Sequence, residues 1–80
     1  MTEETEIADT LDCVGLFCPQ PLFQTKQAIE SIPVGEVLEV LADDPAADGD
    51  LHAFAKRAGH EMVAFENEDG EMRFLIRRLK

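Results

Sequence analysis

Hydrophobic and polar residues change their spacing along this chain, and each change marks a predicted element. Alternating or continuously apolar segments predict four strands, at residues 7–13, 36–42, 61–66 and 72–79. The second of them is apolar on both faces apart from Glu39, as in an interior strand. The Asp69-Gly70 pair between the last two indicates a hairpin turn. In the first strand, the side predicted to face the core consists of Ile7, Asp9, Leu11 and Cys13.

Two other segments place apolar residues three and four positions apart, which predicts amphipathic helices. The first begins at Pro19, whose missing N–H suits the first helical position, and Pro33 ends it. Asp48 or Asp50 is predicted to cap the second, and Gly59 to end it. The predicted inner faces consist of Leu22, Thr25, Ile29 and Ile32, with Phe23 and Ala28 beside them, and of Leu51, Phe54, Ala55 and Ala58.

The element order β-α-β-α-β-β predicts a two-layer α/β sandwich, in which two helices cover one face of a four-stranded mixed sheet. A length of 80 residues allows one domain, predicted at residues 7–80, and no separate cofactor domain. Residues 1–6 are polar and acidic and are predicted to be a flexible tail.

The charge of the chain narrows its partners. Seventeen Asp and Glu residues against seven Lys and Arg give a formal net charge of −10. This charge opposes direct binding to nucleic acid or to an anionic membrane. The start of the chain is acidic, where a secretory signal would be basic, so we predict a cytoplasmic protein. An acidic surface also suits a cell with concentrated internal salt, a hypothesis that melting temperatures across a salt series would test.

The segment Cys-Pro-Gln-Pro at residues 18–21 carries the clearest chemistry. Cys18 falls at or next to the start of the first helix, where unpaired N–H groups and the helix dipole stabilise a thiolate. We therefore expect a lowered pKa for its thiol. Pro19 and Pro21 would fix the first turn, and Leu16 and Phe17 would form an apolar rim that docks on a partner protein.

Other polar residues are weaker candidates. His52 and His60 lie eight positions apart, which is the wrong spacing for a zinc site with two cysteines, so no metal is predicted. No nucleotide or flavin motif is present in the sequence, and no cofactor is predicted. Loop and capping roles are favoured for Asp43 and Asp44 over a paired-carboxylate site. Asp12 is a candidate for supporting the loop before the motif cysteine.

Taken together, these residues resemble a known signature. The segment Leu11-Asp12-x-x-Gly15-Leu16-x-Cys18-Pro19-x-Pro21 resembles that of the TusA/SirA-like sulfur-carrier family. The likeness continues through Pro33-x-Gly35-Glu36, Ala42-Asp43-Asp44-Pro45-Ala46, Gly59-His60-Glu61 and Phe74-Leu75-Ile76-Arg77. The resemblance implies the same β-α-β-α-β-β sandwich. It also implies that Cys18 holds a persulfide, with motif support from Pro19, Pro21, Gly15 and Asp12.

A function follows from the resemblance. The protein would accept sulfane sulfur from a cysteine desulfurase or rhodanese and pass it to an acceptor enzyme, as a sulfurtransferase or as a carrier that is not itself an enzyme. Family members serve tRNA thiolation, molybdenum-cofactor biosynthesis and sulfur oxidation. We expect a monomer that forms transient complexes. Phe17 stands where members often have a basic residue, and Lys26 is the only cation in the first helix. These departures bear on the partner interface and not on the chemistry at Cys18.

Alternative roles remain for the two cysteines. Cys13 is a possible resolving thiol that attacks a Cys18 persulfide, although a buried strand thiol is favoured. The same fold would also serve a non-catalytic regulatory module whose Cys18 senses redox state. A thiol-disulfide oxidoreductase ranks third, because four residues separate the cysteines where the usual redox motif has two.

Overall fold

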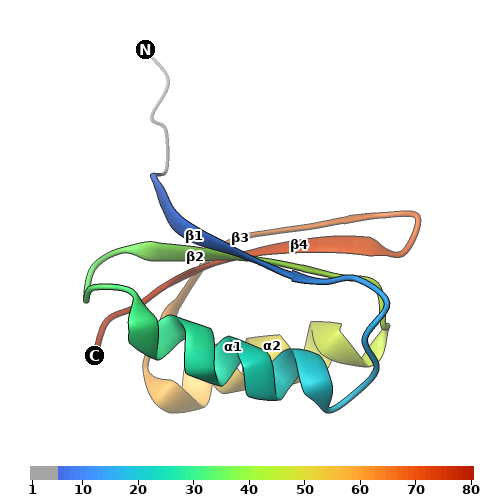
Figure 1. Ribbon diagram of the computed structural model, residues 1–80, viewed down its shortest axis with the longest axis horizontal. Coiled ribbons are helices and arrows are strands. Elements are labelled where there is room, and N and C mark those ends of the chain that lie inside the picture. The colour runs from blue at the N-terminus through green and yellow to red at the C-terminus, as the bar shows by residue number, and fades with distance from the viewer. Residues whose placement is uncertain (1–5) are drawn as a thin grey trace.

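Four strands and two helices follow one another in the predicted order. The computed structural model describes residues 6–80, so the predicted tail lies outside the described residues except for Glu6. The elements are β1 (Ile7–Cys13), α1 (Gln20–Ser31), β2 (Val37–Ala42), α2 (Ala46–Ala58), β3 (Glu61–Glu68) and β4 (Glu71–Arg77). Both helices lie on one face of the sheet, which confirms the two-layer α/β sandwich (Figure 1).

The order of strands in the sheet is β1-β2-β4-β3. β1 and β2 are parallel, whereas the β2–β4 and β3–β4 pairs are antiparallel, so the sheet is mixed as predicted. β2 is the interior strand that its apolar pattern indicated. Because β1 and β2 are parallel and pair Cys13 with Ala42, the loops that follow these two strands leave the sheet side by side.

The core lies between the sheet and the helices. Leu38, Val40, Phe74 and Ile76 of the sheet are completely buried, and Ile29 and Leu51 cover them from the helices. Burial of large side chains is the main stabilising contribution in a domain of this size. This core fixes the two helices, and therefore fixes where each of them begins.

Both helices begin at other positions than predicted. Pro19 is the N-cap of α1 and not its first residue. α2 begins at Ala46, so neither Asp48 nor Asp50 caps it. Pro45 explains the earlier start, because its φ of −54° is already helical. The helix ends agree better with prediction: α1 stops before Pro33, and Gly59 ends α2 with a φ of 80°.

Three positions predicted on or beside the core side are exposed, namely Ile7, Asp9 and Phe23. Asp9 lies on an edge strand, where the register shifts between Ile7 and Asp9. Phe23 is 55% exposed because the buried stripe of α1 follows Pro21 and Thr25, and residue 23 lies about 200° around the helix from each of them.

The hairpin between β3 and β4 is confirmed. Asp69 and Gly70 both have positive φ, at 54° and 91°, as a tight turn of this kind requires. The strands on either side extend to Glu68 and restart at Glu71, and β4 ends at Arg77, two residues earlier than predicted. Within residues 6–80, no helix is long and apolar enough to cross a membrane.

Candidate functional site

The loops after β1 and β2 are joined by two carboxylates. The Cys18 N–H donates to Oδ2 of Asp44 at 2.6 Å, and the Gly15 N–H donates to Oδ1 of Asp43 at 2.9 Å. The structure therefore shows Asp43 and Asp44 in loop and capping roles. The loop that they hold is the one that carries the motif cysteine. The other oxygen of Asp44 accepts from Ala46 N–H at 3.2 Å, which links the same carboxylate to the start of α2.

The loop between β1 and α1 is also held from its own side. Oδ1 of Asp12 accepts from the Val14 N–H at 2.9 Å, which holds the start of this loop; a role of Asp12 at the motif cysteine stays a prediction. Gly15 has a φ of 87°, a backbone conformation that side chains with a Cβ rarely adopt. The Leu16 N–H then donates to the carbonyl of Cys13 at 3.1 Å. These contacts give the loop one defined path to Cys18.

Cys18 itself is exposed and precedes the N-cap residue of α1. The peptide bond between Cys18 and Pro19 is cis, and Pro21 is buried in the first turn. The sulfur lies 3.1 Å from Oδ2 of Asp50 in α2, to which the thiol donates a hydrogen bond. Asp50 was expected only as a possible helix cap. The structure instead places its carboxylate against the motif sulfur.

The expectation of a lowered pKa at Cys18 is wrong. The hydrogen bond to Asp50 raises the thiol pKa above its ordinary value, and partial desolvation and the charges of Asp50 and Asp44 act in the same direction. A helix N-terminus carries about half a positive charge, which two nearby carboxylates outweigh. The surroundings of Cys18 therefore favour the thiol over the thiolate.

Cys13 has an entirely different environment. Its side chain is completely buried, and burial raises its pKa, with the charge of Asp12 as a smaller cause. Both cysteines are free thiols. A buried thiol with a raised pKa is a poor nucleophile, which supports the interpretation of Cys13 as a strand residue of the core.

Two phenylalanines close to Cys18 in the sequence have exposed side chains. Phe17, the residue before Cys18, is 74% exposed, and Phe23 in the second turn of α1 is 55% exposed. Leu16 is partly buried and packs against the core cluster. Exposed aromatic side chains are typical of surfaces that dock on other proteins. Of the predicted rim, Phe17 is therefore exposed whereas Leu16 is packed inward, and docking of this rim on a partner stays a prediction.

The histidines lie in other surroundings. His52 contacts Asp48 in its own helix, and its ring packs against Phe65. His60 accepts a hydrogen bond from the Leu79 N–H at 3.1 Å, and its pKa is lowered by burial and by neighbouring cations. No three His, Cys, Asp or Glu side chains in the described part of the chain are grouped to hold a metal ion.

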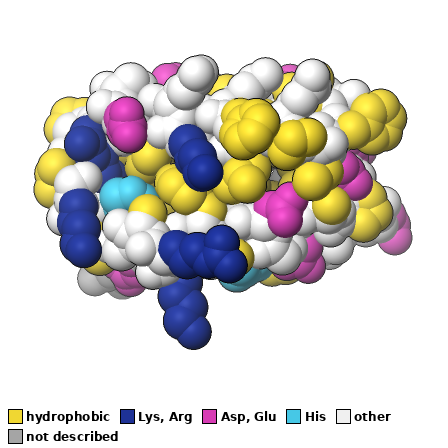
Figure 2. All heavy atoms as spheres, turned by 90° about the horizontal axis from the view of Figure 1, so that it is seen from below, with side chains coloured by type: hydrophobic (Ala, Val, Ile, Leu, Met, Phe, Trp, Pro, Cys, Tyr) yellow, Lys and Arg dark blue, Asp and Glu magenta, His cyan; other side chains and the backbone are white. Residues whose placement is uncertain are grey.

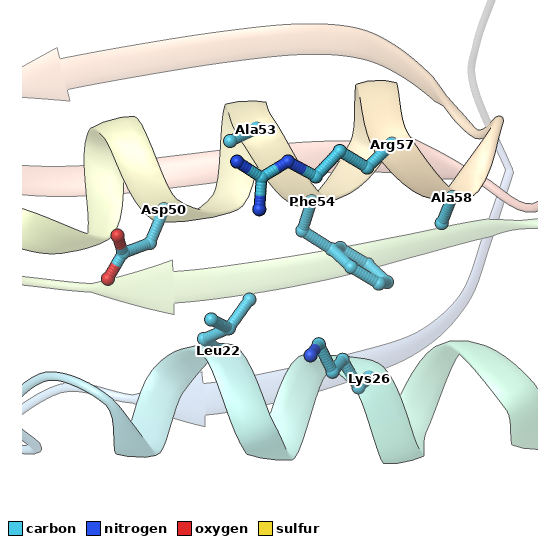
Figure 3. Close-up of a pocket in the computed structure, with 7 residues that line it drawn as sticks. All are labelled: Leu22, Lys26, Asp50, Ala53, Phe54, Arg57 and Ala58. Carbon is cyan, nitrogen blue, oxygen red and sulfur yellow. The ribbon is translucent and has the colours of Figure 1, made fainter.

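Two cations share a hollow with Asp50 and lie farther from Cys18 along the helices. A hollow of about 390 Å³ between α1 and α2 is lined by Asp50 at the Cys18 end and by Lys26 and Arg57 farther along (Figure 3). The sequence did not place the cations of the second half of the chain relative to Cys18. The structure shows that Arg57 lies two turns along α2 from Asp50, in the same hollow.

Comparisons with known proteins cover nearly the whole domain. Residues 9–78 match the family model described as "Sulfurtransferase TusA". A protein of Archaeoglobus fulgidus, provisionally named a sulfur carrier protein, is 48% identical over 71 residues, which are 88% of this chain and 92% of the relative. The sulfur carrier protein TusA of Pseudomonas syringae is 38% identical over 76 residues, which are 95% of this chain and 90% of that protein.

A solved structure is similar as well. The crystal structure of a SirA-like protein from Desulfitobacterium hafniense superimposes with a TM-score of 0.77 at 27% sequence identity. The match covers 90% of this chain and 99% of the other.

Proposed function

Since the chain belongs to the TusA/SirA-like family of sulfur carrier proteins, we propose that Cys18 is the residue that carries the sulfur, as a persulfide. The observation that supports this assignment most is the contrast between the two thiols. Cys18 is exposed on a loop held by Asp43 and Asp44, whereas Cys13 is buried in the core. A sulfur that passes between proteins needs an accessible thiol in a fixed place.

The transfer step is an exchange at sulfur. The sulfur of Cys18 attacks the outer sulfur of a donor persulfide, a new S–S bond forms at Cys18, and the S–S bond of the donor breaks. The donor leaves as a thiolate, and the proton released by Cys18 passes to it. The number of sulfane sulfurs is unchanged, so no external oxidant or reductant is needed. The reverse exchange with an acceptor thiol delivers the sulfur.

Asp50 is the group positioned to take the proton first. Its carboxylate already accepts the hydrogen bond of the Cys18 thiol at 3.1 Å. A general base must lie within hydrogen-bonding distance of the proton that it removes, and Asp50 meets this condition. With its raised pKa, the unloaded thiol is less reactive toward oxidants than a thiolate would be. A donor that brings a cation to this carboxylate would release the thiolate at the moment of transfer.

Partner proteins supply the rest of the pathway. A cysteine desulfurase or rhodanese would be the donor, and an enzyme of tRNA thiolation, molybdenum-cofactor biosynthesis or related sulfur trafficking the acceptor. The exposed ring of Phe17, which precedes Cys18 in the chain, would offer such partners a docking surface. With a net charge of −10, the carrier would leave the holding of RNA to its acceptor.

Sulfur loading tests the proposal. The protein is incubated with a cysteine desulfurase and cysteine, and its intact mass is measured before and after reduction. The wild type and Cys13→Ser should each gain one sulfur atom that reduction removes, and Cys18→Ala should gain none. Loading of Cys18→Ala to the level of the wild type would reject Cys18 as the carrier residue.

A further inference from the structure

A groove runs between α1 and α2, away from Cys18. The hollow that begins at Asp50 continues into a second one of about 490 Å³, and the two share Lys26, Phe54 and Ala58 as lining residues. The second hollow ends at the C-terminal segment that follows β4, where Arg78 and Lys80 line it. The groove therefore connects the motif thiol with the far end of the helix layer.

The charge of this groove is opposite to that of the protein. It contains four of the chain's seven Lys and Arg residues but only two of its seventeen carboxylates. Figure 2 shows the helix face, where Lys and Arg side chains gather toward one end and hydrophobic side chains toward the other. The cations are Lys26, Arg57, Arg78 and Lys80, and the carboxylates are Asp50 and Glu30.

Two of the cations that line the groove are available to a ligand, although the ammonium of Lys26 also lies 6.0 Å from the centroid of the Phe23 ring. Within residues 6–80, neither Lys26 nor Arg57 forms an ion pair, although carboxylates are abundant in this chain. Arg78 differs, because its guanidinium donates to the carbonyls of Glu30 and Ile32 at the end of α1. Arg57 lies in the last turn of α2, where its positive charge interacts favourably with the helix dipole. Lys26 lies in the middle of α1, so the helix dipole does not account for its charge.

The floor of the groove is apolar. Phe54 lies between the helices, and Leu22 lies opposite it on α1 (Figure 3). Both side chains are only partly buried, although they pack against the core cluster. An occupant would thus contact aliphatic and aromatic surface below and two cations at the sides.

We propose that this groove binds an acidic, aliphatic segment of a partner protein and leads that partner toward Cys18. The occupant follows from charge complementarity at Lys26 and Arg57 and from the apolar floor, which Leu or Ile side chains of a peptide would cover. A polynucleotide is disfavoured, because its continuous run of phosphates would extend beyond the groove onto the acidic surface, whereas a short peptide would place its few carboxylates at the groove cations alone. The proposal rests on the carrier function, since it concerns how a donor or acceptor is held.

The test uses a labelled peptide of alternating Glu and Leu, with a Lys-Leu peptide of the same length as control. Binding is followed by amide chemical shifts and by fluorescence anisotropy at low salt. Shifts should be largest along the groove, and Lys26→Gln and Arg57→Gln should each weaken binding by roughly 2- to 5-fold. Lys56→Gln removes a neighbouring cation that does not line the groove, and it should leave the affinity unchanged.

Several outcomes would overturn the proposal. They are equal effects of Lys56→Gln and Arg57→Gln, shifts confined to other faces, or tighter binding of a single-stranded oligonucleotide than of the Glu-Leu peptide. The peptide titration is repeated on Cys18→Ala, which has no thiol at residue 18 to carry sulfur, so that peptide binding is measured independently of sulfur loading. Peptide binding without sulfur loading of the wild type would count against the carrier assignment alone. Loading without peptide binding would count against the groove alone.

Discussion

Removal of the Asp44 carboxylate should loosen the loop that carries Cys18. Asp44 is half-buried and accepts two backbone hydrogen bonds, from Cys18 at 2.6 Å and from Ala46 at 3.2 Å. A hydrogen bond to a charged group contributes about 1.5–3 kcal/mol, and a weaker one about 0.5–1.5 kcal/mol. We take the lower end of each range, about 1.5 and about 0.5 kcal/mol, because the site is partly solvated. Asp44→Ala should therefore lower the free energy of unfolding by about 2 kcal/mol.

For a domain of this size, that loss lowers the melting temperature by roughly 8–16 °C. Urea unfolding measures the free energy, and calorimetry measures the melting temperature. Asp44→Asn is the intermediate variant, because its single amide oxygen can accept only one of the two backbone hydrogen bonds and its NH2 would face the other N–H. Asp43→Ala loses only the hydrogen bond from Gly15, so its free energy of unfolding should lie between those of the wild type and Asp44→Ala. If Asp44→Ala were as stable as the wild type within about 0.5 kcal/mol, the loop would not be held as described.

Further predictions concern the thiols and pH. Asp50→Asn should shift the pH profile of Cys18 alkylation to lower pH, because the amide weakens the hydrogen bond that raises the thiol pKa most and also removes the charge of Asp50; an unchanged profile would contradict this. Cys13 should react with iodoacetamide only in denaturant, which peptide mass spectrometry can follow, and rapid native labelling would show that the strand opens. The hydrogen bond from Arg73 lowers the pKa of Glu39 in the folded protein. The stabilising contribution of Glu39 is therefore present above its pKa in the unfolded chain, and it is lost as the pH falls through its pKa in the folded protein. Glu39→Gln should therefore flatten the acid side of the stability profile, and an unaltered acid slope would exclude this pair as its cause.

Much of the architecture could be predicted because it depends on local pattern. The interior strand β2 is apolar on both faces, and the Asp69-Gly70 turn has a backbone that few other pairs adopt. Cys18 and its prolines were identified from adjacent residues alone. Helix starts were less accurate, because Pro45 begins α2 before the aspartates that were expected to cap it.

The electrostatics of the site could not be predicted in the same way. Asp44 and Asp50 lie 26 and 32 positions from Cys18, and only the parallel pairing of β1 with β2 brings their segments to the thiol. The sequence placed Cys18 at a helix start and showed no carboxylate next to it in the chain. The sign of the pKa shift therefore depended on long-range contacts, and the prediction from the helix dipole was wrong.

The central claim, that Cys18 carries sulfane sulfur between proteins, is tested most directly by cyanolysis of the loaded chain. The protein is loaded by a desulfurase and cysteine, separated from the donor and treated with cyanide, which converts persulfide sulfur to thiocyanate. Colorimetry should find close to one thiocyanate per chain for the wild type and for Cys13→Ser, and none for Cys18→Ala. Equal yields from the wild type and Cys18→Ala, or no thiocyanate from the wild type, would contradict the assignment.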